Sequence, residues 1–333
     1  MSAKPAPALK ERAVPDGIRL VLVMTEQDTL VPPRELNSLV DLCVQAEEAG
    51  VDCVMMSEHI LLGATAGSQG RMANPRDYAA PGNQDPATPW PSSLVMLSAV
   101  AARTTRIRLA AAAVIAPLRH PLVLAKEFGT LDLLSGGRLV VLPTVSWHED
   151  EYAALGVPFK ERGKILDDHL EVMAKAWGDY PVTHDGPYSS FGPVWLEPGA
   201  FAADGPTMWF GGQGIQPALL RRLVRYGHGL NPFGALTGED LEAVREAFRA
   251  SGRDPQSLEL VGGIRGRFTG PDDLASLNDA LQGLPAQVDA GFRSVCVKPS
   301  MYLDDPRRFS AWCRDLIARV EDVSGLPVVM THE

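Results

Sequence analysis

Short apolar runs rich in β-branched residues alternate along the chain with longer amphipathic segments from residue 18 onward. This alternation is typical of a parallel sheet whose strands are buried on both faces and joined by helices. The expected strands are 18–24, 51–57, 107–115, 138–142, 207–210, 228–231, 258–264 and 294–298. The expected helices are 33–49, 91–103, 121–134, 162–177, 217–226, 238–251, a segment around 272–281, and 305–320. Pro33 suits a first helical turn, and Gly50 suits the cap at the end of that helix.

No linker separates these eight expected strands, so the pattern predicts one α/β domain, a (β/α)8 barrel of TIM type, over residues 18–333. Two segments depart from the βα rhythm. Residues 61–89 form a long loop after the second strand, and residues 180–206 predict a small hairpin insertion before the fifth. Loops of such length inside a domain usually serve function, so both are expected to wall a pocket.

Composition and charge narrow the class of protein. The chain has 333 residues, 45% of them hydrophobic, and a formal net charge of -10, which argues against nucleic acid or an anionic membrane as a partner. No apolar run approaches the roughly 20 residues of a membrane span. Residues 1–17 lack an apolar core and predict a flexible tail rather than a signal peptide, which favours a cytoplasmic location. The four cysteines lack metal-ligand spacing and are expected to be reduced thiols in the core.

Catalytic groups of such barrels project from the carboxyl ends of the strands. Glu58 and His59 follow the second strand, where an imidazole can donate a proton to a substrate or accept one. A hydrogen-bonded histidine with no chemical role is the alternative. Trp147, after the fourth strand, offers a flat apolar surface for a ring system, whereas Trp209 is expected to pack in the core.

A glycine-rich turn formed by Gly211, Gly212, Gln213 and Gly214 follows the fifth strand and precedes a helix. Bare backbone amides and a positive helix end can hold a phosphate there, although a plain tight turn is the alternative. The chain has no dinucleotide-binding GxGxxG after its first strand, no Walker A loop, no GxSxG elbow and no HExxH. These absences argue against a nucleotide kinase, a serine hydrolase and a zinc protease, and no metal site is expected.

An ordered set of segments resembles the luciferase-like monooxygenase superfamily, and most closely its coenzyme F420-dependent branch. The segments are 57–59, 97–109, 117–121, 125–126, 130–132 and 134–138, followed by Trp147, Glu149, Tyr152, 155–157, Phe159, 162–163, Trp177 and 209–212. The resemblance is good from about residue 18 to residue 231 and loose beyond.

The resemblance implies a barrel that holds a reduced flavin or deazaflavin across the strand ends and acts on a small organic substrate, in a homodimer. His59 falls at the family's active-site histidine and Glu58 at the acidic residue beside it. Ala113 and Val114 match a bulge in the third strand where a cis peptide bond often supports the cofactor ring. Residues 211–213 match the cofactor-phosphate loop.

One departure concerns the fourth strand, after which the family usually reads Gly-x-Gly-x-Gly-Trp. Here Leu142, Thr144 and Ser146 replace the three glycines and Pro143 removes an amide donor, although the hydroxyls of Thr144 and Ser146 can face a phosphate. Three functions therefore stay open: an F420-dependent oxidoreductase that transfers hydride, an FMN-dependent monooxygenase, and a barrel that has lost redox chemistry and serves as a binding protein.

Overall fold

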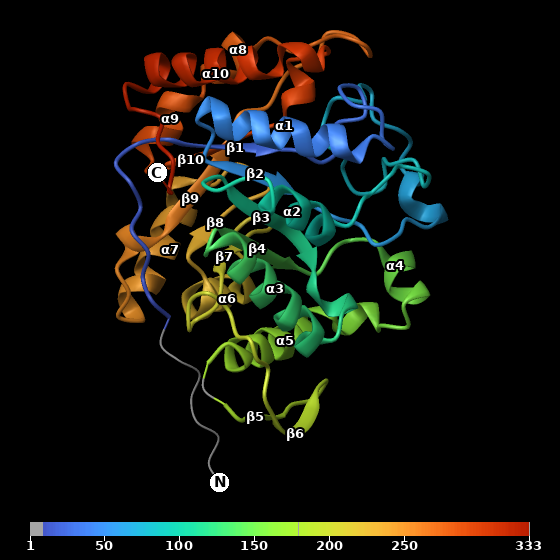
Figure 1. Cartoon of the computed structure of the whole chain (residues 1–333), viewed down its shortest axis with the longest axis vertical. Helices are drawn as coiled ribbons and strands as arrows, with labels where there is room; N and C mark the ends of the chain where they lie inside the picture. The colour runs from blue at the N-terminus through green and yellow to red at the C-terminus, as the bar shows by residue number, and fades with distance from the viewer. Residues whose placement is uncertain (1–8, 179, 333) are drawn as a thin grey trace. The chain divides into compact units, whose positions relative to one another are not determined.

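The computed structural model describes residues 9–178 and 180–332. Its eight parallel strands close into a barrel in the order β1-β10-β9-β8-β7-β4-β3-β2, and a separate two-stranded sheet pairs β5 with β6. The predicted barrel is therefore confirmed (Figure 1). The barrel strands are β1 (Arg19–Val23), β2 (Cys53–Met56), β3 (Arg108–Ile115), β4 (Leu139–Thr144), β7 (Thr207–Phe210), β8 (Gly229–Leu230), β9 (Glu259–Gly263) and β10 (Ser294–Val297).

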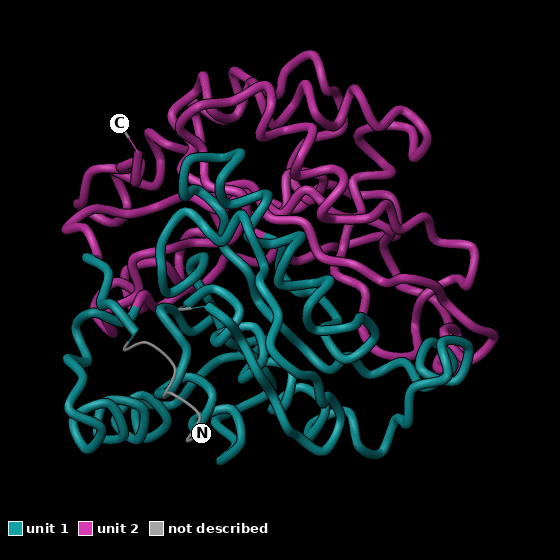
Figure 2. Tube along the Cα trace, turned by 60° about the horizontal axis from the view of Figure 1, so that its bottom comes forward, with its two compact units in different colours: residues 1–13, 111–258 teal, residues 14–110, 259–333 magenta. Residues whose placement is uncertain are grey.

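The chain divides into two compact units, which Figure 2 shows in different colours. Unit 1 comprises residues 1–13 and 111–258, and unit 2 comprises residues 14–110 and 259–333. In unit 2, β1 pairs in parallel with β2 and β10, and β10 pairs with β9. In unit 1, β7 pairs in parallel with β4 and β8. Each unit thus contributes a continuous run of barrel strands.

Helices follow the strands as the amphipathic periods predict. The principal ones are α1 (Leu36–Ala49), α2 (Ser93–Ala101), α3 (Pro121–Ser135), α4 (Glu149–Ala154), α5 (Arg162–Ala176), α6 (Pro217–Tyr226), α7 (Gly238–Ala250), α8 (Leu277–Leu281), α9 (Leu284–Asp289) and α10 (Phe309–Ser324). In unit 2, α1 lies beside α10 (Figure 1). In unit 1, α3 lies beside α5, which also contacts the hairpin of β5 (Val182–Asp185) and β6 (Ser190–Val194).

The start predicted for the first helix is wrong. Helix α1 begins at Leu36, and Pro33 lies in a turn closed by a 2.9 Å hydrogen bond from the Glu35 N–H to the Pro32 carbonyl. Glu35 has a non-helical backbone (φ -89°, ψ 59°) and forms the N-cap, so the helix does not extend back to Pro33. The predicted end is confirmed, since Gly50 caps α1 with a left-handed φ of 97°.

The last third of the chain holds a second correction. One helix was expected around residues 272–281, but α8 begins only at Leu277, with the Ser276 side chain accepting a hydrogen bond from the Asp279 N–H. A further short helix, α9, follows it. Gly283 separates the two, as expected for a residue that disfavours helix interiors.

The first seventeen residues were predicted to form a tail, of which residues 1–8 lie outside the described residues. Lys10 donates its N–H to the Asp204 carboxylate at 2.9 Å. Arg12 donates to the Thr207 hydroxyl at 2.9 Å, and the Glu11 carboxylate accepts from the Asp254 N–H at 2.8 Å. Arg12 also donates to the Gly205 carbonyl at 3.0 Å. Residues 10–12 are thus hydrogen-bonded to residues 204, 205, 207 and 254 of the same unit.

A buried ion network joins the amino ends of five strands in unit 2. Arg108, the first residue of β3, donates to the Asp52 carboxylate at 2.7 Å and to both oxygens of Glu259 at 2.9 and 3.0 Å. Arg19 of β1 pairs with Glu259 at 3.1 Å, and Ser294 of β10 donates its hydroxyl to the same carboxylate. Burial alone would raise the pKa of Glu259, but the charges of Arg108 and Arg19 outweigh burial and lower that pKa to about 2.

We expect Glu259→Gln to lower the free energy of unfolding at pH 7 by about 3 kcal/mol or more, because it leaves two buried guanidinium groups undercompensated. The native pKa is depressed, so the stability that Glu259 contributes is present above its ordinary pKa of 4.5 and is lost as the pH falls toward about 2. Urea unfolding at pH 7 and pH 3 checks both points. The difference in free energy of unfolding between wild type and variant should be smaller at pH 3 than at pH 7. Glu48→Gln, at an exposed site on α1, serves as the control. An equal loss at both pH values would contradict the linkage.

Candidate active site

Glu58 and His59 follow β2 in unit 2, and both side chains are buried. The Ser93 hydroxyl, at the start of α2, donates to a Glu58 carboxylate oxygen at 3.1 Å. The His59 ring meets the ring of Trp90 edge-on, with centroids 5.0 Å apart and planes at 78°. The indole Nε1–H of Trp90 is buried and makes no hydrogen bond within the described residues. The structure therefore places an imidazole beside an orphaned donor, with a fixed carboxylate next to it in sequence.

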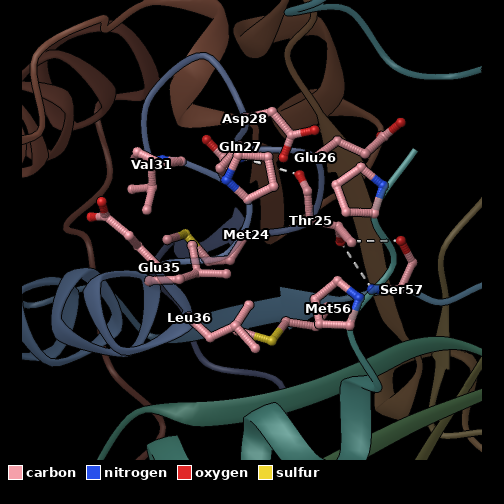
Figure 3. Close-up of a pocket in the computed structure, with 15 residues that line it drawn as sticks. Met24, Thr25, Glu26, Gln27, Asp28, Val31, Glu35, Leu36, Met56 and Ser57 are labelled. Carbon is pink, nitrogen blue, oxygen red and sulfur yellow. Dashed lines mark hydrogen bonds between the residues drawn. The ribbon is translucent and has the colours of Figure 1, made fainter. Parts of the chain in front are cut away.

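Polar groups at the ends of β1 and β2 meet near these residues. The Thr25 hydroxyl lies 3.1 Å from the Ser57 hydroxyl and accepts the Ser57 N–H at 3.0 Å (Figure 3). The recess beside them, lined also by Met24, Glu26 and Leu36, has a volume of only about 30 Å³. A space of that size holds one or two water molecules rather than an organic ligand.

The end of β3 in unit 1 carries the predicted Ala113 and Val114. The peptide bond between Ala112 and Ala113 is cis. Ala113 is half-buried, whereas Val114 is fully buried. Only Ala113 of this pair is therefore accessible from solvent.

The end of β4 carries Thr144, Ser146 and Trp147, all half-buried. Ser146 has φ 57°, a left-handed conformation that favours glycine. Trp147 lies against the His148 ring, with centroids 4.8 Å apart. Ser146 occupies the third glycine position of the expected pattern, so the backbone keeps a glycine-like conformation although the glycine is gone.

Gly211 ends up closely packed against the neighbouring strand end in unit 1. A Cβ atom built on Gly211 would lie 2.0 Å from the Asn231 carbonyl oxygen and 3.6 Å from Cδ1 of Leu142. Leu142 is fully buried and holds the first glycine position of the pattern. Packing alone thus requires glycine at residue 211, with or without a bound phosphate.

Gly212, Gln213 and Gly214 are less confined. A Cβ on Gly212 would make only an ordinary 3.7 Å contact with Leu219, and one on Gly214 would meet nothing within 4 Å, although its φ is 72°. Helix α6 begins three residues later with Pro217 at its first position, and its N-cap residue Gln216 makes no side-chain cap hydrogen bond. These three residues form an open loop before a positive helix end, as phosphate binding requires.

The predicted residues fall into two groups. Unit 1 holds Ala113, Val114, Thr144, Ser146, Trp147 and residues 211–214 at the ends of β3, β4 and β7. Unit 2 holds Glu58 and His59 at the end of β2, together with Ser93, Trp90 and Thr25, which the sequence analysis did not single out. Trp90 lies between two prolines at the end of the long loop. A tryptophan at that position was the sequence feature that could have pointed to this group of residues.

Trp209, His120 and the four cysteines take structural positions. Trp209 is fully buried, as expected for core packing. His120 caps α3, accepting the Leu122 N–H at 3.3 Å, which is a structural role. All four cysteines are buried, and burial raises the pKa of Cys43 to about 12.

Comparison with known proteins agrees with a flavin-type barrel. The family model of luciferase-like monooxygenases matches residues 19–270. The chain belongs to this family, whose members are oxidoreductases and monooxygenases. The family resemblance inferred from the ordered motifs is thereby confirmed.

Three individual matches show how far the likeness extends. An uncharacterised protein of Mycobacterium tuberculosis (strain ATCC 25618 / H37Rv) is 34% identical over 177 residues, which cover 52% of this chain and 60% of that relative. The F420-dependent glucose-6-phosphate dehydrogenase of Kineococcus radiotolerans is 29% identical over 254 residues, covering 70% of this chain and 64% of that protein. The crystal structure of the long-chain alkane monooxygenase LadA superposes with a TM-score of 0.68 at 16% identity and covers 96% of this chain and 94% of LadA. The last match shows the fold alone.

Within residues 9–178 and 180–332, no helix combines the length and apolar character that crossing a bilayer demands. The same residues contain no group of three or more His, Cys, Asp or Glu side chains placed to hold a metal ion.

Ser146→Gly should raise the free energy of unfolding by roughly 0.5–1 kcal/mol, because it relieves a left-handed serine at some cost in chain entropy. Ser146→Val should lower it by at least as much, since a β-branched residue tolerates that conformation worst. Ser146→Ala is the matched control, because it removes the hydroxyl and leaves the conformational cost in place. Chemical unfolding of the three variants checks the order Gly, Ala, Val; a glycine variant less stable than the alanine variant would contradict it.

Proposed function

We propose that this protein is an F420-dependent oxidoreductase that transfers hydride between the deazaflavin and a small organic substrate. The observation that carries the proposal is the group at the end of β2: buried His59 beside the orphaned Trp90 N–H, with Glu58 held by Ser93. The family match and the similarity to an F420-dependent dehydrogenase support the choice of chemistry.

The cofactor half of the proposal rests on residues 211–214 and on the end of β4. The open loop of Gly212, Gln213 and Gly214 fits a phosphate, while Gly211 keeps the loop close to the end of β8. Ala113, Thr144, Ser146 and Trp147 offer half-buried surface for the rest of the cofactor. When bound, the deazaflavin would accept or supply the hydride.

The chain's own residues would handle the proton. When the substrate is an alcohol, the carbon loses a hydride to the cofactor and the hydroxyl oxygen loses a proton to a base. His59 is the imidazole at the end of β2 that would accept this proton. In the reverse direction the same imidazole returns the proton. Glu58, fixed by the Ser93 hydroxyl, would set the charge next to His59, and Trp90 would limit the orientations of its ring.

An FMN-dependent monooxygenase is the second candidate, because the matching family model is one of luciferase-like monooxygenases. A barrel without redox chemistry is the third, and Leu142 is the feature that favours it, since it fills the first glycine position. The substrate is proposed to be a neutral or apolar organic molecule. A cytoplasmic homodimer is proposed as well, and the exposed Val123, Leu133 and Leu134 of α3 suit an interface between copies.

Titration with F420 and with FMN, followed by fluorescence quenching, tests the cofactor. We expect F420 to bind in the micromolar range and FMN to bind far more weakly. Gly212→Ala should weaken F420 binding by about tenfold, since a methyl group would block close approach of a phosphate to the backbone. The same variant should melt like the wild type, because its Cβ makes only an ordinary contact. FMN binding without F420 binding favours the monooxygenase, and binding of neither favours the non-redox barrel.

His59→Ala should lower kcat by about 10²–10⁴-fold and leave the F420 affinity unchanged, because it removes a general acid or base and no phosphate contact. His120→Asn is the matched control: it replaces another histidine but preserves the capping of α3. Steady-state kinetics and the cofactor titration together check the expectation. Turnover equal to that of the wild type would return His59 to a structural role.

A further inference from the structure

A groove of about 770 Å³ runs along the loop after β9 in unit 2, between residues 265–271 and residues 73–77 of the long loop. Pockets of this volume accommodate small organic ligands. The loop belongs to the seventh barrel strand, and late loops of βα barrels commonly bind phosphate groups. None of the residues that line the groove belongs to the glycine-rich loop at residues 211–214.

The backbone of this loop is rich in unsatisfied donors. The N–H groups of residues 265–270 make no hydrogen bond to any of the described residues. Backbone donors need partners, so these N–H groups are bonded to water or to a ligand. At the end of this run, the Asn74 side-chain amide donates to the carbonyls of Gly270 and Asp273, both at 3.0 Å.

The loop is held in place at its far end. The two Asn74 hydrogen bonds fix its far end, and the Ala275 N–H donates to the Met301 carbonyl at 2.8 Å. A Cβ built on Gly266 would lie 2.4 Å from Cβ of Ala275, so the backbone lies close against its neighbour. The free amides are therefore part of an anchored loop.

Two arginines flank these amides. Arg265 donates to both oxygens of Asp77, at 3.0 and 2.9 Å, so its charge is balanced. Arg267 is exposed and forms no ion pair or hydrogen bond within the described residues. The groove lining thus carries two positive charges against the single carboxylate of Asp77, in a chain whose net charge is -10.

We infer that this groove binds the anionic oxygen group of a small molecule, a phosphate or a carboxylate. The free amides of residues 265–270 would donate hydrogen bonds to the group, and Arg267 would supply the uncompensated charge. Arg265, held by Asp77, would flank the group without needing to leave its partner. All of these groups line the groove, so the site does not depend on which cofactor the barrel binds.

Isothermal titration with inorganic phosphate and with acetate, at an ionic strength held constant with chloride, tests the site on the full chain without cofactor. Wild type should show saturable binding of at least one anion, and Arg267→Gln should weaken it by roughly tenfold or more. Because Arg267 is exposed and forms no hydrogen bond or ion pair with a described residue, the variant should melt like the wild type. Arg34→Gln, which removes the same charge from another exposed site in unit 2, should bind like the wild type.

Preference for phosphate would assign a phosphorylated ligand, and binding of acetate equally or better would assign a carboxylate; both outcomes support the site. Hydrogen exchange should also slow across residues 265–270 when the anion is present. Absence of saturable binding by the wild type overturns the inference. Binding by Arg267→Gln as tight as that of the wild type also overturns it, since the anion would then be held elsewhere, for example at residues 212–214.

Discussion

The barrel half formed by unit 2 depends on one buried interaction, the Arg108 guanidinium held between the Asp52 and Glu259 carboxylates. These groups stand at the amino ends of β3, β2 and β9, and Arg19 and Ser294 bring β1 and β10 into the same network. Parallel strands with continuous apolar faces have little to fix their relative register, since a shifted strand still buries apolar side chains. A bidentate ion pair among five strand ends fixes it, because any slip would leave a buried charge unpaired.

A second set of charges fixes the long loop at the carboxyl end of the last strand. Lys298, fully buried just after β10, donates to the Asp77 carbonyl at 2.7 Å and lies 3.5 Å from the Glu26 carboxylate. Burial lowers the pKa of the Lys298 ammonium group, and the negative charge of Glu26 partly offsets this by raising that pKa. Arg265 holds the side chain of the same Asp77. Two cations from neighbouring strand ends thus position the long loop, residues 61–89, which runs from His59 to Trp90.

Much of this architecture could be predicted from the sequence, and the reasons are local. All eight barrel strands were expected near their observed bounds, because most are short apolar runs between turn residues. The start of α1 could not be placed as reliably, because Pro33 satisfies the rule for a first helical turn as well as the rule for a turn before the helix. The ion network gave no sequence signal at all: Arg108 and Glu259 are 151 residues apart, and each reads simply as a polar residue at a strand edge.

In the candidate site, too, features set by neighbouring residues could be predicted, whereas contacts between distant residues could not. His59 was predictable because it follows a strand directly, whereas its contact with Trp90 spans the whole loop and depends on how that loop folds back. The sequence showed only that three glycines of the family pattern are replaced. The structure shows that two of these replacements, Ser146 and Leu142, differ in their effect. Ser146 keeps the left-handed conformation of the residue it replaces, so the path of the chain before Trp147 is preserved there. Leu142 differs in kind: its side chain is buried beneath Gly211, in the space that a glycine would have left open. Leu142 therefore fills volume beside Gly211, whereas Ser146 leaves the backbone conformation of the pattern unchanged.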